Sequence, residues 1–217
     1  MKVKNLYFDT EFTSLSKNAD LISIGIFDKN GRCFYAEITD FDRTLCDDWI
    51  KKNVIDNCLF IDKSVDECMA TKEKLTTISS YNDSTFIHNT KEKVSKALNL
   101  WLEEYSNYQI EFVSDVCSYD FVLLVDLITN GKSSLDLPKN ITPDCYNISQ
   151  CIYDEYEISM IDAFNITRED YLNDFDKNKF ILNSIIGEAK HNSLWDAYVI
   201  MIISEYNKGG IIKWVKL

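Results

Sequence analysis

The chain begins with three short apolar segments whose spacing strongly constrains its fold. They cover residues 3–8, 21–27 and 33–38. The second and third are separated by the sequence Asp-Lys-Asn-Gly at 28–31, and an Asn-Gly pair between two apolar runs is typical of a tight hairpin turn. We therefore expect an antiparallel meander of three strands as the start of the fold.

Helices and strands are predicted to alternate along the rest of the chain. Apolar residues at helical spacing and runs of β-branched or aromatic residues predict this order: helix 46–52, helix 91–105, strand 109–113, helix 119–127, strand 145–153, helix 158–174 and helix 194–206. Residues 41–85 are otherwise polar and resist assignment, and turn-forming residues predict loops at 79–84 and 137–144. This order indicates an α/β fold.

The composition indicates one globular unit. At 217 residues and 46% hydrophobic, the chain has enough apolar material for one substantial core, and we expect a single domain over residues 1–217. It contains no apolar run of transmembrane length and no pattern typical of a signal peptide, which predicts a cytoplasmic protein that does not enter a membrane. The seven cysteines form no Cys-x-x-Cys pair, so reduced thiols are expected rather than a disulfide framework or a zinc site.

Asp9 and Glu11 follow the first apolar segment and are two residues apart. Side chains with this spacing on a strand point to the same side of the sheet. Two carboxylates so close repel each other unless a cation lies between them, and a divalent cation with oxygen ligands is the usual occupant. The pair therefore predicts one half of a metal site.

Asp120, His191 and Asp196 are the candidates for the other half. Asp120 lies near the start of the predicted helix 119–127, shortly after a predicted strand, and His191 precedes Asp196 by five residues. Five residues within one helix would place two side chains about 140° apart. The histidine and the aspartate therefore meet at one cation only if His191 lies in the loop before the last helix.

Three motifs together resemble a known family. The segment Asp-Thr-Glu-Phe-Thr-Ser-Leu at 9–15, the Ser-Tyr-Asp element at 118–120 and the pair His191 and Asp196 are similar to the DEDDh 3′-to-5′ exonucleases of the RNase T and DnaQ-like superfamily. The small bacterial and phage exoribonucleases are the most similar branch. The resemblance spans nearly the whole chain. It implies a ribonuclease H-like fold, with a mixed sheet of the meander and parallel strands flanked by helices, and two bound Mg²⁺ or Mn²⁺ ions.

The resemblance also implies a role for each residue of the site. Asp9 would bind both ions, Glu11 and Asp196 the ion that activates water, and Asp120 the second ion, with His191 as the general base. The terminal nucleotide would contact the residues around the metal pair, which are Thr10, Phe12, Thr13 and Leu15.

Several of these residues have local alternatives. Asp115 also lies at the strand end and competes with Asp120 for the third carboxylate position. Ser193 and Asp196 match an N-terminal capping pair, so Asp196 could serve the helix alone. Phe12 and Leu15 could be core residues. His88 is expected in a loop or at a helix cap rather than in the site.

The formal net charge of −12 argues against a large non-specific nucleic-acid surface, because phosphate binding normally recruits an excess of Lys and Arg. Bound cations would offset the site carboxylates, and a short single strand needs only a few basic contacts. We therefore expect 3′-to-5′ hydrolysis of single-stranded RNA or short oligonucleotides. The alternative functions are a proofreading-type DNA exonuclease and an inactive ribonuclease H-like binding module. The resemblance is also compatible with a homodimer.

Overall fold

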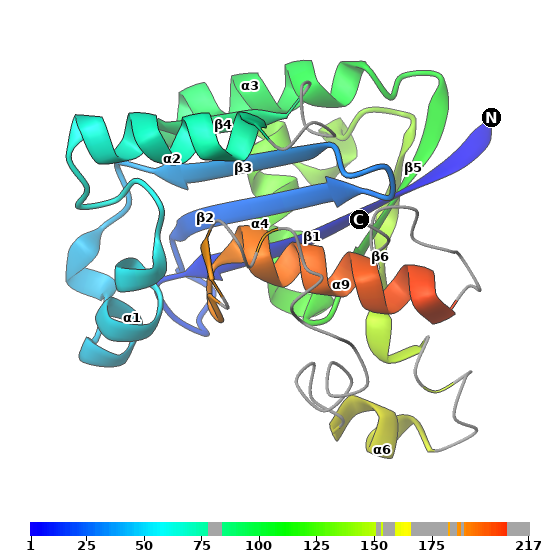
Figure 1. The fold of residues 1–217 in the computed structure, drawn as a ribbon. Coiled ribbons are helices and arrows are strands. Elements are labelled where there is room, and N and C mark those ends of the chain that lie inside the picture. Colours follow the sequence, from blue (N-terminus) through cyan, green and yellow to red (C-terminus); the bar gives the residue numbers. More distant parts are fainter. Residues whose placement is uncertain are drawn as a thin grey trace.

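The computed structural model describes residues 1–77, 84–150, 153, 159–165, 182, 186–187 and 189–207. In this part of the chain a six-stranded sheet has the order β4-β3-β2-β1-β5-β6 (Figure 1). Its strands are β1 (Lys2–Phe12), β2 (Leu21–Asp28), β3 (Cys33–Ile38), β4 (Thr85–Asn89), β5 (Tyr108–Ser114) and β6 (Ile141–Asn147). The first three strands pair antiparallel, whereas β3 with β4, β1 with β5 and β5 with β6 pair parallel.

The predicted meander is confirmed, and its hairpin turn has a clear local cause. The backbone N–H of Asp28 donates to the carbonyl of Arg32, and the N–H of Gly31 donates back to the Asp28 carbonyl. The Asp28 carboxylate also accepts the N–H groups of Asn30 and Arg32. Gly31 has a φ of +88°, a left-handed conformation that favours glycine.

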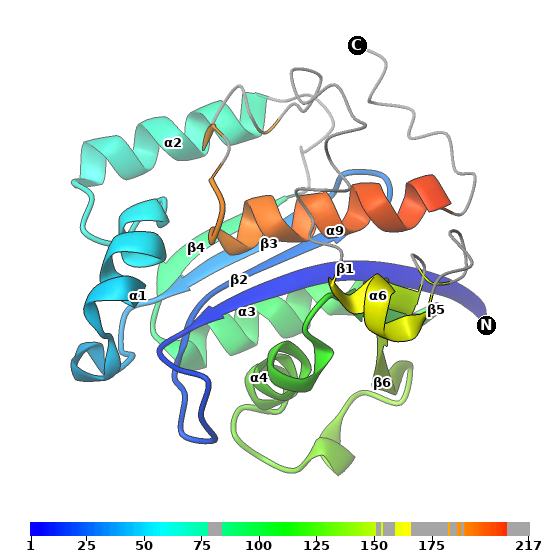
Figure 2. The same ribbon diagram turned by 90° about the horizontal axis from the view of Figure 1, so that it is seen from below.

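Helices cover both faces of the sheet (Figure 2). The longer ones are α2 (Val65–Thr77), α3 (Lys91–Glu103), α4 (Cys117–Thr129) and α9 (Ser193–Asn207), and the shorter ones are α1 (Asp48–Asn53) and α6 (Met160–Asn165). Helices α3 and α4 lie on one face, and α9 lies on the other. The expected fold class, an α/β protein with a mixed sheet flanked by helices, is confirmed and is consistent with a ribonuclease H-like fold.

Alternating residues of β1 divide the core into two layers. Leu6 and Phe8 are fully buried among the side chains of α3 and α4, whereas Tyr7 is buried among those of α9. Each large apolar side chain contributes about 1.5–3 kcal/mol through its burial. Because the sheet is covered on both faces, all eight residues of β2 are buried.

Gly25 sets how closely α9 approaches the sheet. A Cβ atom at Gly25 would lie 2.2 Å from the carbonyl oxygen of Ser193 and 2.6 Å from the Cα of Leu194. Only a residue without a side chain lets the first turn of α9 lie directly on β2. This contact places the start of α9 over the end of β1, since β2 pairs with β1.

Two elements within residues 41–89 are absent from the sequence prediction. Helix α2 occupies polar residues for which no element was assigned. Strand β4 contains His88, so the expectation of a loop or helix-cap position for this histidine is wrong. The sequence of β4, Thr-Phe-Ile-His-Asn, has no strict alternation of apolar and polar residues, which is the pattern that predicts a strand. In the structure all five residues are half-buried.

The region after α4 also differs from the prediction. The strand expected at 145–153 spans Ile141–Asn147 instead, and residues 148–150 are helical. Pro143 therefore lies within a strand and not in the expected loop, which the sheet tolerates because β6 is an edge strand. Within the helix expected at 158–174, the structure describes residues 159–165, and α6 begins at Met160. The other residues of this expected helix lie outside the described residues, as does most of the loop expected at 79–84.

None of the helices in the described ranges has the length and apolar character needed to cross a lipid bilayer.

Candidate metal centre

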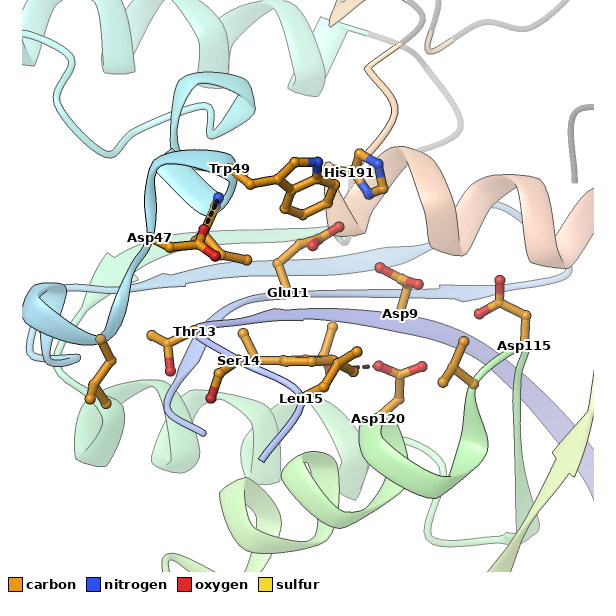
Figure 3. Close-up of a pocket in the computed structure, with 15 residues that line it drawn as sticks. Asp9, Glu11, Thr13, Ser14, Leu15, Asp47, Trp49, Asp115, Asp120 and His191 are labelled. Carbon is orange, nitrogen blue, oxygen red and sulfur yellow. Dashed lines mark hydrogen bonds between the residues drawn. The ribbon is translucent and has the colours of Figure 1, made fainter. Parts of the chain in front are cut away.

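The candidate site lies where β1 extends past its parallel neighbour. The β1–β5 pairing ends with Tyr7 opposite Val113, and β5 itself ends at Ser114, whereas β1 continues to Phe12. Asp9 and Glu11 therefore project from β1 itself, opposite Gly25 and Ser23 of β2, and not from a loop after the strand. Figure 3 shows both carboxylates on the side of β1 that faces His191.

The first group of possible metal ligands consists of Asp9, Asp115 and Asp120. One carboxylate oxygen from each lies within 4.8 Å of the others. Asp9 is 5% exposed and Asp120 is 2% exposed. The structure thus brings both Asp120 and its competitor Asp115 to Asp9, so these two alternatives are not exclusive.

Two hydroxyl groups hold the Asp120 carboxylate in place. The Thr10 hydroxyl donates to Oδ1 at 2.6 Å, and the Ser114 hydroxyl donates to Oδ2 at 2.8 Å. Thr10 comes from β1 and Ser114 from the end of β5, so both strands orient the first turn of α4. Thr10, expected to contact substrate, thus contacts a carboxylate of the site.

The second group consists of Glu11, His191 and Asp196, with one ligand atom from each within 4.8 Å of the others. His191 lies in the turn before α9 with a φ of +61°, as its five-residue spacing from Asp196 predicts. Asp196 is fully buried in the first turns of α9, and its Oδ2 accepts the backbone N–H of His191 at 3.0 Å. The carboxylate therefore also stabilises the turn that carries the histidine.

The cap of α9 is Asn192, so the capping pair of Ser193 and Asp196 considered above is wrong. The Asn192 Oδ1 accepts the backbone N–H groups of Leu194 and Trp195 at 3.1 and 3.3 Å. The Ser193 hydroxyl instead makes a hydrogen bond with the hydroxyl of Ser23 at 2.9 Å.

Asn57 and Asn192 form an asparagine clasp around the turn that carries His191. The Asn57 side-chain amide donates to the carbonyl of Lys190 at 2.8 Å, and the Asn192 amide donates to the carbonyl of Asn57 at 2.8 Å. The clasp ties the turn to the segment that follows α1. Trp49 of α1 contacts the His191 ring edge to face, with ring centroids 5.0 Å apart.

The buried Glu37 connects β3 to the asparagine clasp through hydrogen bonds. Glu37 of β3 accepts the hydroxyl of Tyr35 at 2.5 Å and the backbone N–H groups of residues 59–61. The Tyr35 hydroxyl in turn accepts the Asn192 amide at 3.3 Å. Burial raises the pKa of the Glu37 carboxyl, and the hydrogen bonds from Tyr35 and the backbone oppose this effect.

These elements enclose a pocket of about 490 Å³ (Figure 3). Its lining residues are Asp9, Thr10, Glu11, Phe12, Thr13, Ser14, Leu15, Leu45, Asp47, Trp49, Ile50, Asp115, Val116, Asp120 and His191. Exposed apolar side chains lie at its rim, among them Leu15 at 70% and Trp49 at 53% exposure. Phe12 stacks on Tyr119 with ring centroids 6.0 Å apart.

The donor set fits a hard divalent cation. Five carboxylates and one imidazole line the pocket, and none of the described lining residues is Lys or Arg. Three of these carboxylates, those of Asp9, Glu11 and Asp120, are buried. Buried carboxylates so close together are costly without a compensating cation, and Mg²⁺ and Mn²⁺ prefer oxygen ligands. The two groups, which meet β1 through Asp9 and Glu11, offer positions for two ions.

The expected substrate-binding residues all line the pocket, but the structure gives them different surroundings. The N–H of Thr13 donates to the carbonyl of Asp20, and the Thr13 hydroxyl accepts the N–H of Asp20 at 3.0 Å. Thr13 therefore closes the loop 13–20, and Leu15 projects from that loop. Neither Leu15 nor the half-buried Phe12 belongs to the buried core.

Sequence reasoning missed the contribution of α1 and the segment that precedes it. Leu45, Asp47 and Trp49 all line the pocket. Asp47 caps α1 by accepting the N–H of Ile50 at 2.8 Å. A helix was predicted here, but no pattern within it indicates that it packs beside β1.

No protein-family model matches the chain, and no curated protein shows significant similarity to it.

Proposed function

We propose that this protein is a metal-dependent 3′-to-5′ exonuclease that hydrolyses single-stranded nucleic acid, with RNA favoured, to nucleoside monophosphates. The observation that carries the proposal is the pair of adjacent ligand groups that meet at the overhanging end of β1. Asp9 belongs to one group and Glu11 to the other, and their spacing of two residues keeps the groups side by side.

The carboxylates of the two groups would hold two divalent cations, Mg²⁺ or Mn²⁺. When bound, two such ions would supply charge neutralisation at a phosphodiester and lower the pKa of a bound water. The chain's own contribution is orientation. Because Thr10 and Ser114 already fix both oxygens of Asp120, little conformational freedom is lost when this carboxylate binds a cation.

His191 is assigned as the general base. Histidine is the side chain that ordinarily titrates near neutral pH, so its ring nitrogen accepts the proton of the attacking water. Trp49 packs against the ring and limits its orientations. The hydrogen bond from the His191 N–H to Asp196 holds the backbone of the turn near the ligand group.

The exposed apolar rim favours a single strand as the substrate. Bases in a single strand present free faces, and stacking on apolar or aromatic side chains is worth roughly 1–3 kcal/mol per base without sequence preference. Leu15, Trp49 and Val116 offer such surfaces around the pocket. The net charge of −12 disfavours long duplexes, which demand many basic contacts.

The test incubates the purified protein with 5′-labelled single-stranded RNA and DNA of matched sequence, with Mg²⁺, with Mn²⁺ or with excess chelator. We expect cation-dependent, progressive shortening from the 3′ end and release of nucleoside monophosphates, faster on RNA. A circular single strand and a 3′-phosphorylated strand should resist. Internal cuts in the circle, or full activity in chelator, would exclude the proposal.

Variants locate the activity in the site. Asp9→Asn should abolish hydrolysis without unfolding the protein, because it removes a charge from the paired carboxylates. Asp66→Asn is the matched control, since Asp66 is an exposed first-turn residue of α2 outside the pocket lining. Equal loss in both variants, or no loss in Asp9→Asn, would contradict the assignment.

A further inference from the structure

Two cysteine side chains meet beside the candidate metal centre. The Sγ atoms of Cys117 and Cys145 are 2.7 Å apart, although the residues are 28 positions apart in the chain. A disulfide bond has a length of about 2.05 Å, so a shift of under about 1 Å would join them. Cys117 is the first residue of α4, and Cys145 lies in β6.

The backbone holds the two thiols against each other. Cys145 pairs with Phe112 in the parallel ladder of β5 and β6. The short turn between β5 and α4 is tied to β6 by a hydrogen bond from the Asn147 amide to the carbonyl of Asp115 at 3.0 Å. Because both partners are anchored on neighbouring elements, the contact does not depend on a mobile loop.

A small oxidant can reach this pair. Cys117 and Cys145 are partly exposed, whereas Cys33 and Cys58 are buried in the core. Cys33 is 1% exposed and Cys58 is 4% exposed, so a peroxide has little access to their sulfur atoms. The chain therefore offers one proximal, accessible thiol pair among its described cysteines.

We propose that Cys117 and Cys145 form a reversible disulfide when the protein meets a hydroperoxide. The sulfur of one cysteine attacks the peroxide, forming an S–O bond as the O–O bond breaks, and hydrogen peroxide leaves water and a sulfenic acid. The second thiol attacks that sulfur, forming the S–S bond and releasing a second water. The thiols lose two electrons and two protons, and the peroxide accepts them. A dithiol reductant reverses the reaction.

The disulfide would restrain α4, the helix that carries Asp120 of the first ligand group. It fixes the first residue of α4 to β6, and Asp120 lies in the first turn of α4 while Asp115 lies just before it. Closing a loop of 28 residues restricts the unfolded chain. Oxidation therefore makes this edge of the molecule harder to unfold.

The experiment treats the full chain with equimolar hydrogen peroxide, alkylates the remaining thiols, and maps the peptides by mass spectrometry. We expect one cross-linked peptide that joins Cys117 to Cys145, with Cys33 and Cys58 still thiols. The melting temperature should rise on the order of 5 °C and return after dithiothreitol. Cys145→Ser and, separately, Cys117→Ser should remove both effects.

Either of two results would overturn the proposal: both cysteines remaining as thiols after the treatment, or either of them pairing with a different cysteine. The peptide map measures the bond itself and needs no nucleic-acid substrate. A failure of the cross-link is therefore distinguishable from a failure of the proposed nuclease activity.

Discussion

Single hydroxyl groups determine how well the carboxylates of the centre are placed. Asp120 depends on Thr10 from β1 and on Ser114 from β5, and all three residues are buried. A buried carboxylate that loses such a donor keeps its desolvation cost and loses part of its compensation. These two positions therefore allow a test of ligand placement without removal of a ligand.

Thr10→Val replaces the hydroxyl by a methyl group of similar size. We expect the free energy of unfolding to fall by about 1–3 kcal/mol, because a charged group loses a hydrogen bond in a buried site. Mn²⁺ affinity, measured by calorimetry, should fall as well. Ser114→Ala removes the other donor and should act in the same direction. Unchanged Mn²⁺ affinity in both variants would show that the hydroxyls do not position Asp120.

His191 and Asp196 separate proton transfer from cation binding. His191→Ala should lower turnover by about 10²–10⁴-fold, the usual range for a general base, and leave most of the cation affinity. Asp196→Ala should weaken both, since this carboxylate is buried beside Glu11 and also holds the His191 turn. Rates across pH and cation titration of both variants provide the measurement. If His191→Ala abolished cation binding as fully as Asp9→Asn, the histidine would be a ligand and not the base.

Helix α9 packs directly against the backbone of β2 at Gly25. Gly25→Ala would place a methyl group 2.2 Å from the Ser193 carbonyl, and a backbone atom cannot move aside as a side chain does. We expect the free energy of unfolding to fall by about 3 kcal/mol, the upper end of the usual range for overpacked cores. Denaturant unfolding measures this. Nuclease activity should fall with it, because the start of α9 carries His191 and Asp196.

Gly187→Ala is the matched comparison for Gly25→Ala. Its φ of +72° disfavours alanine by about 1–2 kcal/mol, but no described atom lies within 4 Å of the added Cβ. Gly25 has ordinary strand geometry, so its loss measures packing alone. A loss at Gly25 no larger than the loss at Gly187 would mean that α9 and β2 move apart to accept the methyl group, and that the close contact does not limit the fold.

The sequence was most informative where a local period determines the side-chain direction. A spacing of two on a strand places Asp9 and Glu11 together, and a spacing of five places His191 before the helix. Asp115 and Asp120 could not be ranked, because the turn at the start of α4 brings both to Asp9. The position of α1 beside β1 was not predictable, since it depends on Glu37 and the asparagine clasp, whose partners are far apart in sequence.

At the scale of the whole molecule, the candidate centre joins distant parts of the chain. Its ligand residues come from β1, from the start of α4 and its preceding turn, and from α9 and its preceding turn. A cation that binds the folded chain and not the unfolded one stabilises it by about 2.7 kcal/mol at a hundredfold excess over its dissociation constant.

Added Mn²⁺ should therefore raise the melting temperature, and chelator should return it to the metal-free value. For a chain of this size the expected rise is roughly 5–10 °C at saturation. Asp9→Asn should remove most of the rise, whereas Asp66→Asn should retain it. A rise that persists in Asp9→Asn would place the cation elsewhere on this acidic protein.

The packing of α9 on β1 also has a consequence for synthesis on the ribosome. Strand β1 is synthesised before α9, which follows after roughly ten to forty seconds of elongation at 5–20 residues per second. In that interval the α9 side chains that help to bury Tyr7 and Phe27 are not yet present, and neither His191 nor Asp196 has yet been made. A nascent chain therefore cannot assemble the complete centre, and the uncovered sheet face is the surface that a chaperone would meet.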